Sequence, residues 1–380
     1  MCSGAYKVSQ ARRRTPGRGL VAAVSTAAIM CLLVTACARD GIRHTMPTPA
    51  GVSVDCDGKK RVTAEGSTAQ RNAIALFSQR WAQVCPGKGL SYNPTGSGAG
   101  REQFIAGHVD FAGSDSPLTT QQTDPAAKRC NGNPAWDLPL VFGPIALAYN
   151  VGGLKTLVLS GDVLARIYSG DIRSWNDPAI TALNPGSTLP DLKIRPIYRS
   201  DSSGTTDNFQ RYLAVAAPNS WRKGAGTDFR GGVGEGAERS SGLIAAVQAT
   251  PGAIGYVEEG YAAQADLPFA GINTGSGAVP LADDTVRKAI DAAKFSADGN
   301  DLRLDLDSLY STKEPGAYPL VLASYEIVCS KGYQHDTAAA VKSFLAVAAN
   351  DARDALSAAG YIPLPGRFKQ RLVAAIEAIQ

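Results

Sequence analysis

The sequence is poor in residues that usually hold metal ions. Its three histidines, His44, His108 and His335, are scattered, and no two of its seven cysteines stand at CxxC spacing. Zinc sites combine such residues at short, regular spacings. The sequence therefore argues against a metal site, and we expect no cofactor.

Signatures of nucleophilic catalysis are also missing. Ser97 and Ser203 lie in small polar turns, but neither serine is enclosed by a GxSxG elbow and no paired base is visible. A binding protein is thus favoured over an enzyme.

An excess of charge of one sign is confined to the N-terminal segment. Five basic residues and no acidic residue occur in the first 36 positions. Without those five, 33 basic residues face 34 acidic ones, which is a formal charge of −1. A near-neutral body argues against nucleic acid as the partner.

The N-terminal segment is typical of an export signal. An apolar run, 20–34, is too short for a typical transmembrane helix. It ends in Val34-Thr35-Ala36-Cys37, which resembles the lipobox of bacterial lipoproteins, with Val34 where Leu is usual. We expect a signal peptide at 1–36, an acylated Cys37, and a tether at 37–55 on the extracytoplasmic face of the cell membrane. Plain secretion or an uncleaved anchor is the alternative.

Four cysteines remain after the signal peptide and Cys37 are set aside: Cys56, Cys85, Cys130 and Cys329. An even number in an exported protein predicts two disulfides, with three possible pairings. We favour Cys56–Cys85, because a strand followed by a returning helix brings these two ends together. Cys130–Cys329 is then the second pair.

The rest of the chain has the pattern of an α/β protein. A capping box, Ser67 to Gln70, predicts the start of the first helix, and Ile74, Phe77, Trp81 and Val84 form its apolar face. Segments 118–137 and 218–240 are expected to be loops. Strands are expected at 60–64, 90–93, 109–112, 138–149, 192–198, 252–257 and 319–328. Helices are expected at 67–85, 101–106, 161–168, 208–215, from 243, at 285–295, 336–359 and 365–379.

Small polar turns follow several of these strands. Ligands of α/β proteins bind at the carboxyl ends of strands. Arg199 is followed four residues later by Ser203, an expected N-cap that would leave the amides of Gly204 and Thr205 free. Free amides, hydroxyls and the positive end of a helix form an anion site, to which arginine adds a charged fork. An ordinary capped helix with an unrelated arginine is the alternative.

Three other turns have the same character. Thr68 and the Ala69 amide lie at the first turn of the first helix, Ser97 lies in a glycine-rich turn, and Asp115 follows the third strand. The first three turns should belong to one domain and the turn at Arg199 to another. The sequence therefore predicts a cleft that encloses an oxyanion from both sides.

Asp115 is unusual in an anion site, because a carboxylate repels an anion that has no proton to donate. Hydrogen phosphate carries such a proton near neutral pH and sulfate does not, so Asp115 would reject sulfate. An Asx-turn or a helix cap is the alternative role for Asp115. Asp201 is expected to orient Arg199 through a salt bridge, or else to be solvated.

At this point the chain resembles a known family from about Arg61 to its C-terminus. It is similar to the periplasmic-type phosphate-binding proteins, the substrate-binding components of the phosphate-specific ABC importer, and to their lipoprotein forms in actinobacteria. The segments that carry the resemblance are 65–68, 95–98, 109–118, 175–180 and 199–206.

The resemblance implies a function and a fold. It implies phosphate ligands at Thr68, Ala69 (backbone only), Ser97, Asp115, Arg199, Ser203, Gly204 and Thr205. It also implies a two-lobed type II periplasmic binding protein fold, with lobe I at 56–142 and 266–380 and lobe II at 143–265. Two crossing strands, near 142–144 and after 256–257, would join the lobes, and closure of the monomer around the ion would create the surface read by the membrane permease.

Three other functions remain open. Sulfate or molybdate is an alternative ligand, against which Asp115 argues. An enzyme that hydrolyses phosphate esters is a second alternative, and a role in adhesion or sensing is a third.

Overall fold

The computed structural model describes residues 54–350 and 353–380. The expected signal peptide, Cys37 and nearly all of the tether lie outside the described residues. Within the described ranges, no helix is long and apolar enough to cross a membrane.

The first part of the chain alternates strands and helices, as the sequence predicts. Strand β1 pairs in parallel with both β2 and β3, so the carboxyl ends of the three strands lie at one edge of the sheet. The elements are β1 (Arg61–Gly66), α1 (Arg71–Val84), β2 (Gly89–Pro94), α2 (Ser97–Ile105), β3 (Phe111–Ser114) and α3 (Thr120–Arg129).

The middle of the chain repeats this alternation around a second parallel group. Strand β6 pairs in parallel with β7 and β8. The elements are β4 (Ala135–Tyr149), β5 (Val158–Ser160), α4 (Gly161–Ser169), α5 (Pro178–Thr181), β6 (Arg195–Arg199), α6 (Gly204–Ala216), β7 (Glu235–Ala237), α7 (Arg239–Ala249), β8 (Ala253–Glu258) and α8 (Glu259–Gln264).

The last part returns to the first group of strands. Strand β13 pairs antiparallel with β3, beside the N-terminal strands. The elements are β9 (Phe269–Asn273), β10 (Ala278–Val279), α9 (Asp283–Ala292), β11 (Lys294–Phe295), β12 (Leu304–Asp305), α10 (Leu306–Tyr310), β13 (Val321–Cys329), α11 (His335–Asn350), α12 (Arg353–Ala358), β14 (Ile362–Pro363) and α13 (Gly366–Glu377).

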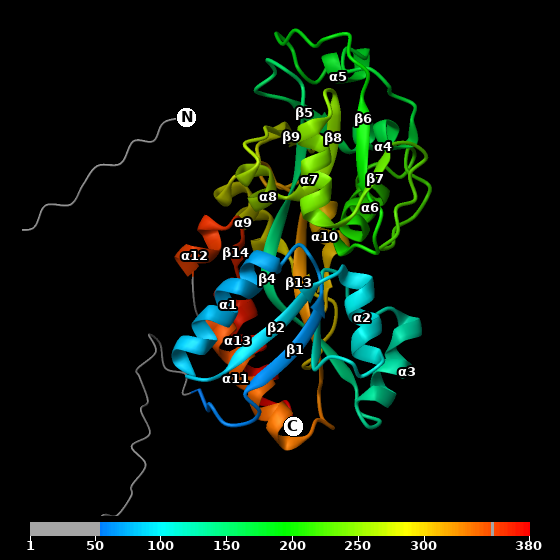
Figure 1. The fold of residues 1–380 in the computed structure, drawn as a ribbon. Coiled ribbons are helices and arrows are strands. Elements are labelled where there is room, and N and C mark those ends of the chain that lie inside the picture. The colour runs from blue at the N-terminus through cyan, green and yellow to red at the C-terminus, as the bar shows by residue number, and fades with distance from the viewer. Residues whose placement is uncertain (1–53, 351–352) are drawn as a thin grey trace, which may run out of the picture. The chain divides into compact units, whose positions relative to one another are not determined.

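One long strand links the two parallel groups. The strand order is β2-β1-β3-β13-β4-β8-β6-β7. Strand β4 pairs with β13 over 135–144 and with β8 over 145–149, so it changes partner between Pro144 and Ile145. Figure 1 shows β4 and β13 running lengthwise between the two groups.

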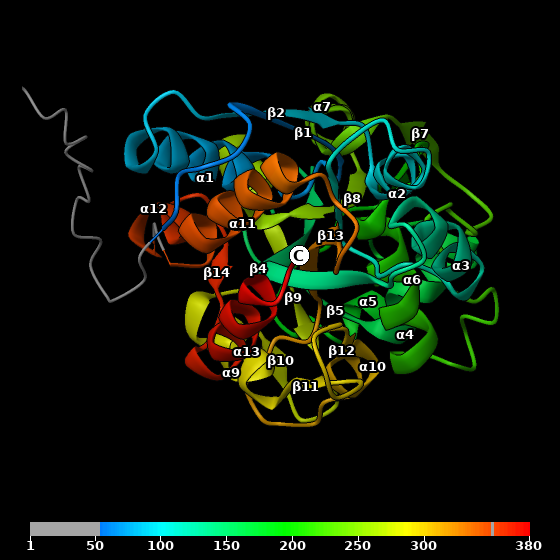
Figure 2. The same ribbon diagram turned by 90° about the horizontal axis from the view of Figure 1, so that it is seen from below.

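Helices cover both sides of the N-terminal group of strands. Helices α1 and α11 lie on one side and α2 and α3 on the other (Figures 1 and 2). Helix α1 has the expected apolar face, of which Ile74, Phe77 and Trp81 are buried. The Trp81 ring meets the edge of Phe344 of α11 at 5.6 Å between ring centroids, and Phe344 stacks on Phe111 of β3 at 5.5 Å. These rings fix α1 and α11 against the sheet.

The expected capping box at Ser67 is wrong in part. The Ser67 hydroxyl accepts the amides of Ala69 and Gln70 at 3.0 and 3.4 Å, but regular helix begins only at Arg71. The Gln70 side chain does not return to the Ser67 amide. It donates instead to the Tyr92 hydroxyl at 3.2 Å, because Gln70 is fully buried rather than exposed at the helix start.

The segment 118–137 is not the expected loop. It contains α3, whose first turn is closed by a capping box between Thr119 and Gln122. Only Ala126 of this helix is buried, so no apolar period marked it in the sequence. Strand β7 lies within the segment 218–240, which was expected to be a loop. The segment 336–359, expected to be one helix, contains two helices, α11 and α12.

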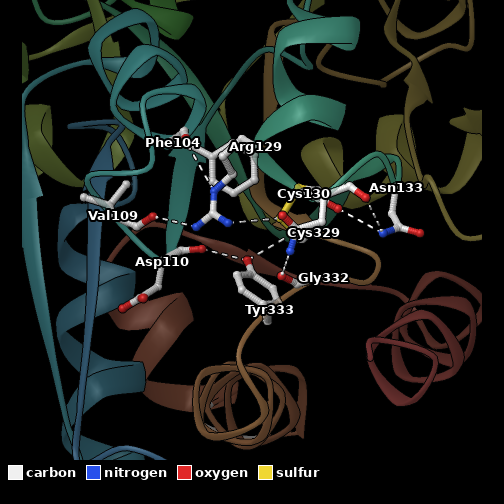
Figure 3. The surroundings of a disulfide bond; sticks show 10 residues. Phe104, Val109, Asp110, Arg129, Cys130, Asn133, Cys329, Gly332 and Tyr333 are labelled. Atoms are coloured by element: carbon white, nitrogen blue, oxygen red, sulfur yellow. Dashed lines mark hydrogen bonds between the residues drawn. A yellow bond between two sulfur atoms is a disulfide. The ribbon is translucent and has the colours of Figure 1, made fainter.

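Both expected disulfides are confirmed. Cys56 bonds to Cys85, and Cys130 bonds to Cys329 over a separation of 199 residues. Figure 3 shows the second bond, which ties the end of α3 to the end of β13. Beside it, the Arg129 guanidinium lies over Phe104 and Tyr333, 4.8 and 5.2 Å from the ring centroids. The guanidinium also donates to the Val109 and Phe104 carbonyls, so α3 is bound to the end of the sheet by covalent and polar contacts.

Candidate anion-binding site

The structure brings the four polar turns into one buried region. Each turn follows the carboxyl end of a parallel strand or begins the helix after it. The turns meet because the two parallel groups, β1–β3 and β6–β8, present these ends toward each other. All eight residues predicted from the sequence are buried: Thr68, Ala69, Ser97, Asp115, Arg199, Ser203, Gly204 and Thr205.

Direct contacts join the two groups of strands here. The Thr68 hydroxyl lies 2.8 Å from the Ser240 hydroxyl, which accepts the Arg199 guanidinium at 3.2 Å. On the other side, Gly204 packs so closely that a Cβ added to it would lie 2.5 Å from Ser97 Oγ and 2.8 Å from an Asp115 carboxylate oxygen. Glycine at 204 is therefore required for the first turn of α6 to approach Asp115.

Three hydroxyl groups hold the Asp115 carboxylate. Ser67 donates at 2.7 Å, Ser97 at 3.1 Å and Ser324 at 2.7 Å. Burial raises the pKa of Asp115 to about 6 and the charge of Glu258 adds to the shift, while the three hydroxyls oppose it. Asp115 thus remains an acceptor at neutral pH, with its orientation fixed.

The guanidinium of Arg199 is fixed by Asp201. Its Nε donates to Asp201 at 2.7 Å, and a second nitrogen forms an ion pair with the other carboxylate oxygen. Burial lowers the pKa of Arg199, but bonding to Asp201 outweighs burial, so the pKa lies above its ordinary value. Burial alone would raise the pKa of Asp201, but the hydrogen bond and charge of Arg199 outweigh burial. The pKa of Asp201 therefore lies below its ordinary value. The pair is therefore charged and rigid.

Helix α6 begins at the site. Ser203 is its N-cap and accepts the Thr206 amide at 3.2 Å. Within the described residues, the amides of Gly204 and Thr205 have no acceptor, because the Ser203 cap accepts only the Thr206 amide. Helix α2 begins at Ser97 rather than near Arg101, so a second helix start lies at the site. By contrast, the Ala69 amide is already bonded to Ser67.

Sequence reasoning missed several residues of this region. Ser240 contacts Thr68 from 172 residues away, and Ser324 contacts Asp115 from 209 residues away. The Thr205 hydroxyl donates to Glu258, at the end of β8. Two tyrosines, Tyr261 and Tyr361, bond to the carbonyls of Thr68 and Ala69. No local motif marks these residues, because their positions depend on the pairing of distant strands.

The site combines one fixed cation, free helix amides, hydroxyls and one fixed acceptor. Within residues 54–350 and 353–380, no group of three or more metal-ligating side chains gathers. An arrangement of this kind can surround a small tetrahedral oxyanion that carries a proton.

The fold defines the class of the protein, which is a two-lobed, type II periplasmic binding protein. The PBP superfamily domain matches residues 50–352. The chain is 48% identical over 363 residues to phosphate-binding protein PstS 3 of Mycobacterium tuberculosis, covering 94% of this chain and 98% of the relative. It is also 48% identical over 364 residues to PstS 2 of the same organism, with the same coverage. The chain belongs to this family of phosphate-binding proteins.

A solved structure supports the fold. The periplasmic phosphate-binding protein PfluDING aligns with a TM-score of 0.66 and 22% identity, over 83% of this chain and 93% of that chain.

Proposed function

We propose that this protein binds inorganic phosphate outside the cytoplasm and delivers it to the permease of a phosphate ABC importer. The observation that carries the proposal is a fixed acceptor, Asp115, in the same buried region as the fixed Arg199 guanidinium and the free amides of α6. Hydrogen phosphate matches this set of one acceptor and many donors, whereas sulfate places an unprotonated oxygen against Asp115. Membership of a family named for phosphate binding supports the same ligand.

We propose that the ligands come from the set expected from the sequence. Arg199 and the α6 amides provide positive charge and donors from one lobe, and Thr68, Ser97 and Asp115 provide the contacts of the other. Glu258 and Ser240 lie against these residues. We assign the lobes to 56–142 with 266–380, and to 143–265, which agrees with the change of partner of β4 at 144–145.

Ligand binding is then coupled to transport by closure of the lobes. Donors from both lobes contact one ion, so the ion stabilises the closed arrangement over the open one. The permease would recognise the surface formed by both lobes, with the monomer held at the membrane by a lipid on Cys37. No catalytic step is required.

Calorimetry on the purified protein tests the proposal. Bound ion is first removed by unfolding and refolding, and the protein is then titrated with phosphate, sulfate and molybdate. Saturable binding of phosphate without a sulfate or molybdate signal is expected. Equal binding of sulfate would keep an anion site but reject the role of Asp115, and silence from all three ions on folded protein would reject the proposed function.

A further inference from the structure

The group of strands β6–β8 carries a groove at the end opposite to the anion site. The groove has a volume of about 410 Å³ and is lined by the first residues of β6 and β7. Arg195 begins β6 and Arg199 ends it, so roughly 13 Å of strand separates the groove from the anion site. The floor of the groove consists of Ile167, Ile172, Ile194, Pro196 and Val233.

Val233 extends this apolar floor to the surface. Among the described residues, it is the only large hydrophobic side chain that is exposed, at 37%. It packs against Gly170, where an added Cβ would lie 2.7 Å from a Val233 methyl carbon. A single exposed apolar residue is ordinary, but Val233 adjoins the floor and forms one apolar surface with it.

Three exposed cationic side chains line the same groove. They are those of Arg173, Lys193 and Arg195, and within the described residues none of them takes part in an ion pair. Arg173 Nε donates to the Gly170 carbonyl at 2.7 Å, which leaves the charge of the guanidinium without a counterion. Glu235 is the one carboxylate of the lining, so the groove has an excess of positive charge.

Backbone pairing places these cations on neighbouring segments. Ser174 and Lys193 form an antiparallel bridge, and the Arg173 carbonyl accepts the Ile194 amide at 2.8 Å. The backbone that carries the cations is therefore fixed, and only the ends of the side chains need to be ordered when a partner binds.

Charge and topology together indicate the kind of partner that the groove fits. Unpaired cations around an apolar floor complement a partner that presents both carboxylates and apolar side chains. Strand β7 is the last strand in the sheet order and pairs with β6 alone among the described strands. Its second edge offers backbone groups to an extended segment. A small inorganic anion would pair with the cations but leave the floor uncovered.

We propose that this groove is a docking site for an acidic, extended peptide segment of another protein. Acidic side chains of the segment pair with Arg173, Lys193 and Arg195, and an apolar side chain covers the floor beside Val233. The docking site lies apart from the anion site, so this inference does not rest on the proposed phosphate binding.

The experiment measures the binding of fluorescent synthetic peptides to the full chain by anisotropy. The probe is a peptide of about eight residues in which glutamate and leucine alternate, within the usual length of a strand. In one control peptide serine replaces leucine, and in the other lysine replaces glutamate. We expect saturable binding of the glutamate–leucine peptide alone, weakened by added salt. No binding of this peptide, or equal binding of either control peptide, overturns the proposal.

Charge reversal assigns the binding to the groove. Lys193→Glu combined with Arg195→Glu is expected to lower the affinity for the glutamate–leucine peptide by about tenfold or more, because two attractions become repulsions. Lys128→Glu combined with Lys155→Glu is the matched control. It changes the net charge equally at two exposed lysines outside the groove, and it should bind the peptide as the unaltered protein does. Equal loss in both double variants overturns the proposal, because the attraction would then be general.

Apolar contact is tested separately with Val233→Ser. This variant keeps every charge of the groove, and it is expected to weaken binding of the glutamate–leucine peptide several-fold. Unchanged affinity removes the apolar floor from the proposed contact and overturns the docking site as stated. Urea unfolding checks that each variant is folded, independently of any ligand.

Competition separates this site from other anion-binding surfaces. Inorganic phosphate should leave the bound peptide in place, and displacement by phosphate would assign the peptide to the anion site and overturn the proposal. Vesicles of phosphatidylglycerol and phosphatidylcholine are tested in parallel. Vesicle binding that requires Lys193 and Arg195, without peptide binding, would overturn the proposal in favour of a membrane surface. A protein that binds the peptide but no phosphate would reject the proposed function and retain the docking site.

Discussion

At the scale of single residues, the site depends on groups that are fixed before a ligand arrives. Asp115 is held by three serine hydroxyls from three separate segments, and Arg199 is held by both oxygens of Asp201. Fixed donors and acceptors need little reorganisation on binding and cannot turn to suit a wrong ligand. Selectivity is therefore expected to change when a single side chain changes.

Asp115→Asn is expected to relax the discrimination against sulfate. Asparagine can present a donor where the carboxylate presents an acceptor, which removes an unpaired contact worth about 1–3 kcal/mol. We expect the ratio of phosphate to sulfate affinity to fall by about 10- to 100-fold, with a smaller loss of phosphate affinity. Calorimetry with both ions measures the ratio, and exposed Asp162→Asn is the control. If sulfate binding stays undetectable in Asp115→Asn, the proton-acceptor role of Asp115 is wrong.

Arg199→Ala is expected to abolish tight phosphate binding. The variant removes the Arg199 guanidinium, and with it charge-assisted hydrogen bonds to the ion that are together worth about 3 kcal/mol or more. That loss corresponds to a fall in affinity of about 100-fold or more. Arg195→Ala, at an exposed position of the same strand, is the matched control and should bind normally. Unchanged affinity in Arg199→Ala would remove Arg199 from the site.

At the scale of elements, β13 places a buried carboxyl group near Gln70, just before the start of α1. Glu326 of β13 is fully buried, and within the described residues neither of its oxygens accepts a hydrogen bond in the structure. In the same part of the chain, the side-chain oxygen of Gln70, Oε1, also lacks a donor. Burial raises the pKa of Glu326 well above its ordinary value. We expect a protonated Glu326 to donate to the side-chain oxygen of Gln70, which would satisfy both groups and connect β13 to the turn that carries Thr68 and Ala69.

Glu326→Gln is expected to remove a pH dependence of stability. The unfolded chain ionises this carboxyl above about pH 4.5, whereas the folded protein keeps it protonated. The stability that the protonated Glu326 carboxyl contributes is therefore fully present below about pH 4.5. As the pH rises toward the pKa of Glu326 in the folded protein, this stability falls by up to about 1.4 kcal/mol per pH unit. Glutamine is neutral and can still donate to Gln70, so the variant should be the more stable protein at pH 8.

Urea unfolding at pH 5 and pH 8 measures the difference. Exposed Glu314→Gln is the control and should behave as the unaltered protein does at both pH values. A Glu326→Gln protein that loses as much stability between pH 5 and pH 8 as the unaltered protein would contradict a protonated Glu326.

At the scale of the whole molecule, segments that are far apart in sequence complete one another. Strand β13 lies between β3 and β4, and its Ser324 supports Asp115. The disulfide Cys130–Cys329 fixes the far end of the same strand to α3. The first group of strands is thus complete only when the C-terminal part of the chain has returned to it.

The two disulfides are expected to differ in their contribution to stability. In the chain-entropy account, cross-links that close longer loops restrict the unfolded chain more. Separations of 199 and 29 residues then differ by roughly 1.7 kcal/mol. Replacing both Cys130 and Cys329 by alanine should destabilise the protein more than the same replacement of Cys56 and Cys85, as measured by urea unfolding. An equal or reversed order would show that local contacts, such as those of Arg129, outweigh loop closure.

Local sequence determined the order of the main strands and helices and the residue types of the site. Apolar periods located α1 and β4, and the small polar turns identified Thr68, Ser97, Asp115 and Arg199, because such turns end strands and begin helices within a few residues. The residues also favoured the disulfide pairing that the structure has. Helix α3 escaped prediction because it buries only Ala126, and the role of Gln70 was misread because its burial depends on β2 and β13.

Only the tertiary structure decided what surrounds the predicted residues. Ser240, Ser324 and Glu258 lie at the site because β8, α7 and β13 pack there, and these contacts join residues up to 209 positions apart. Hydrogen bonds and charge act through space over a few ångströms, whereas sequence patterns record only near neighbours along the chain. The sequence by itself therefore determined which groups could bind an oxyanion, and the fold decided which distant side chains, such as Ser240, Ser324 and Glu258, surround those groups.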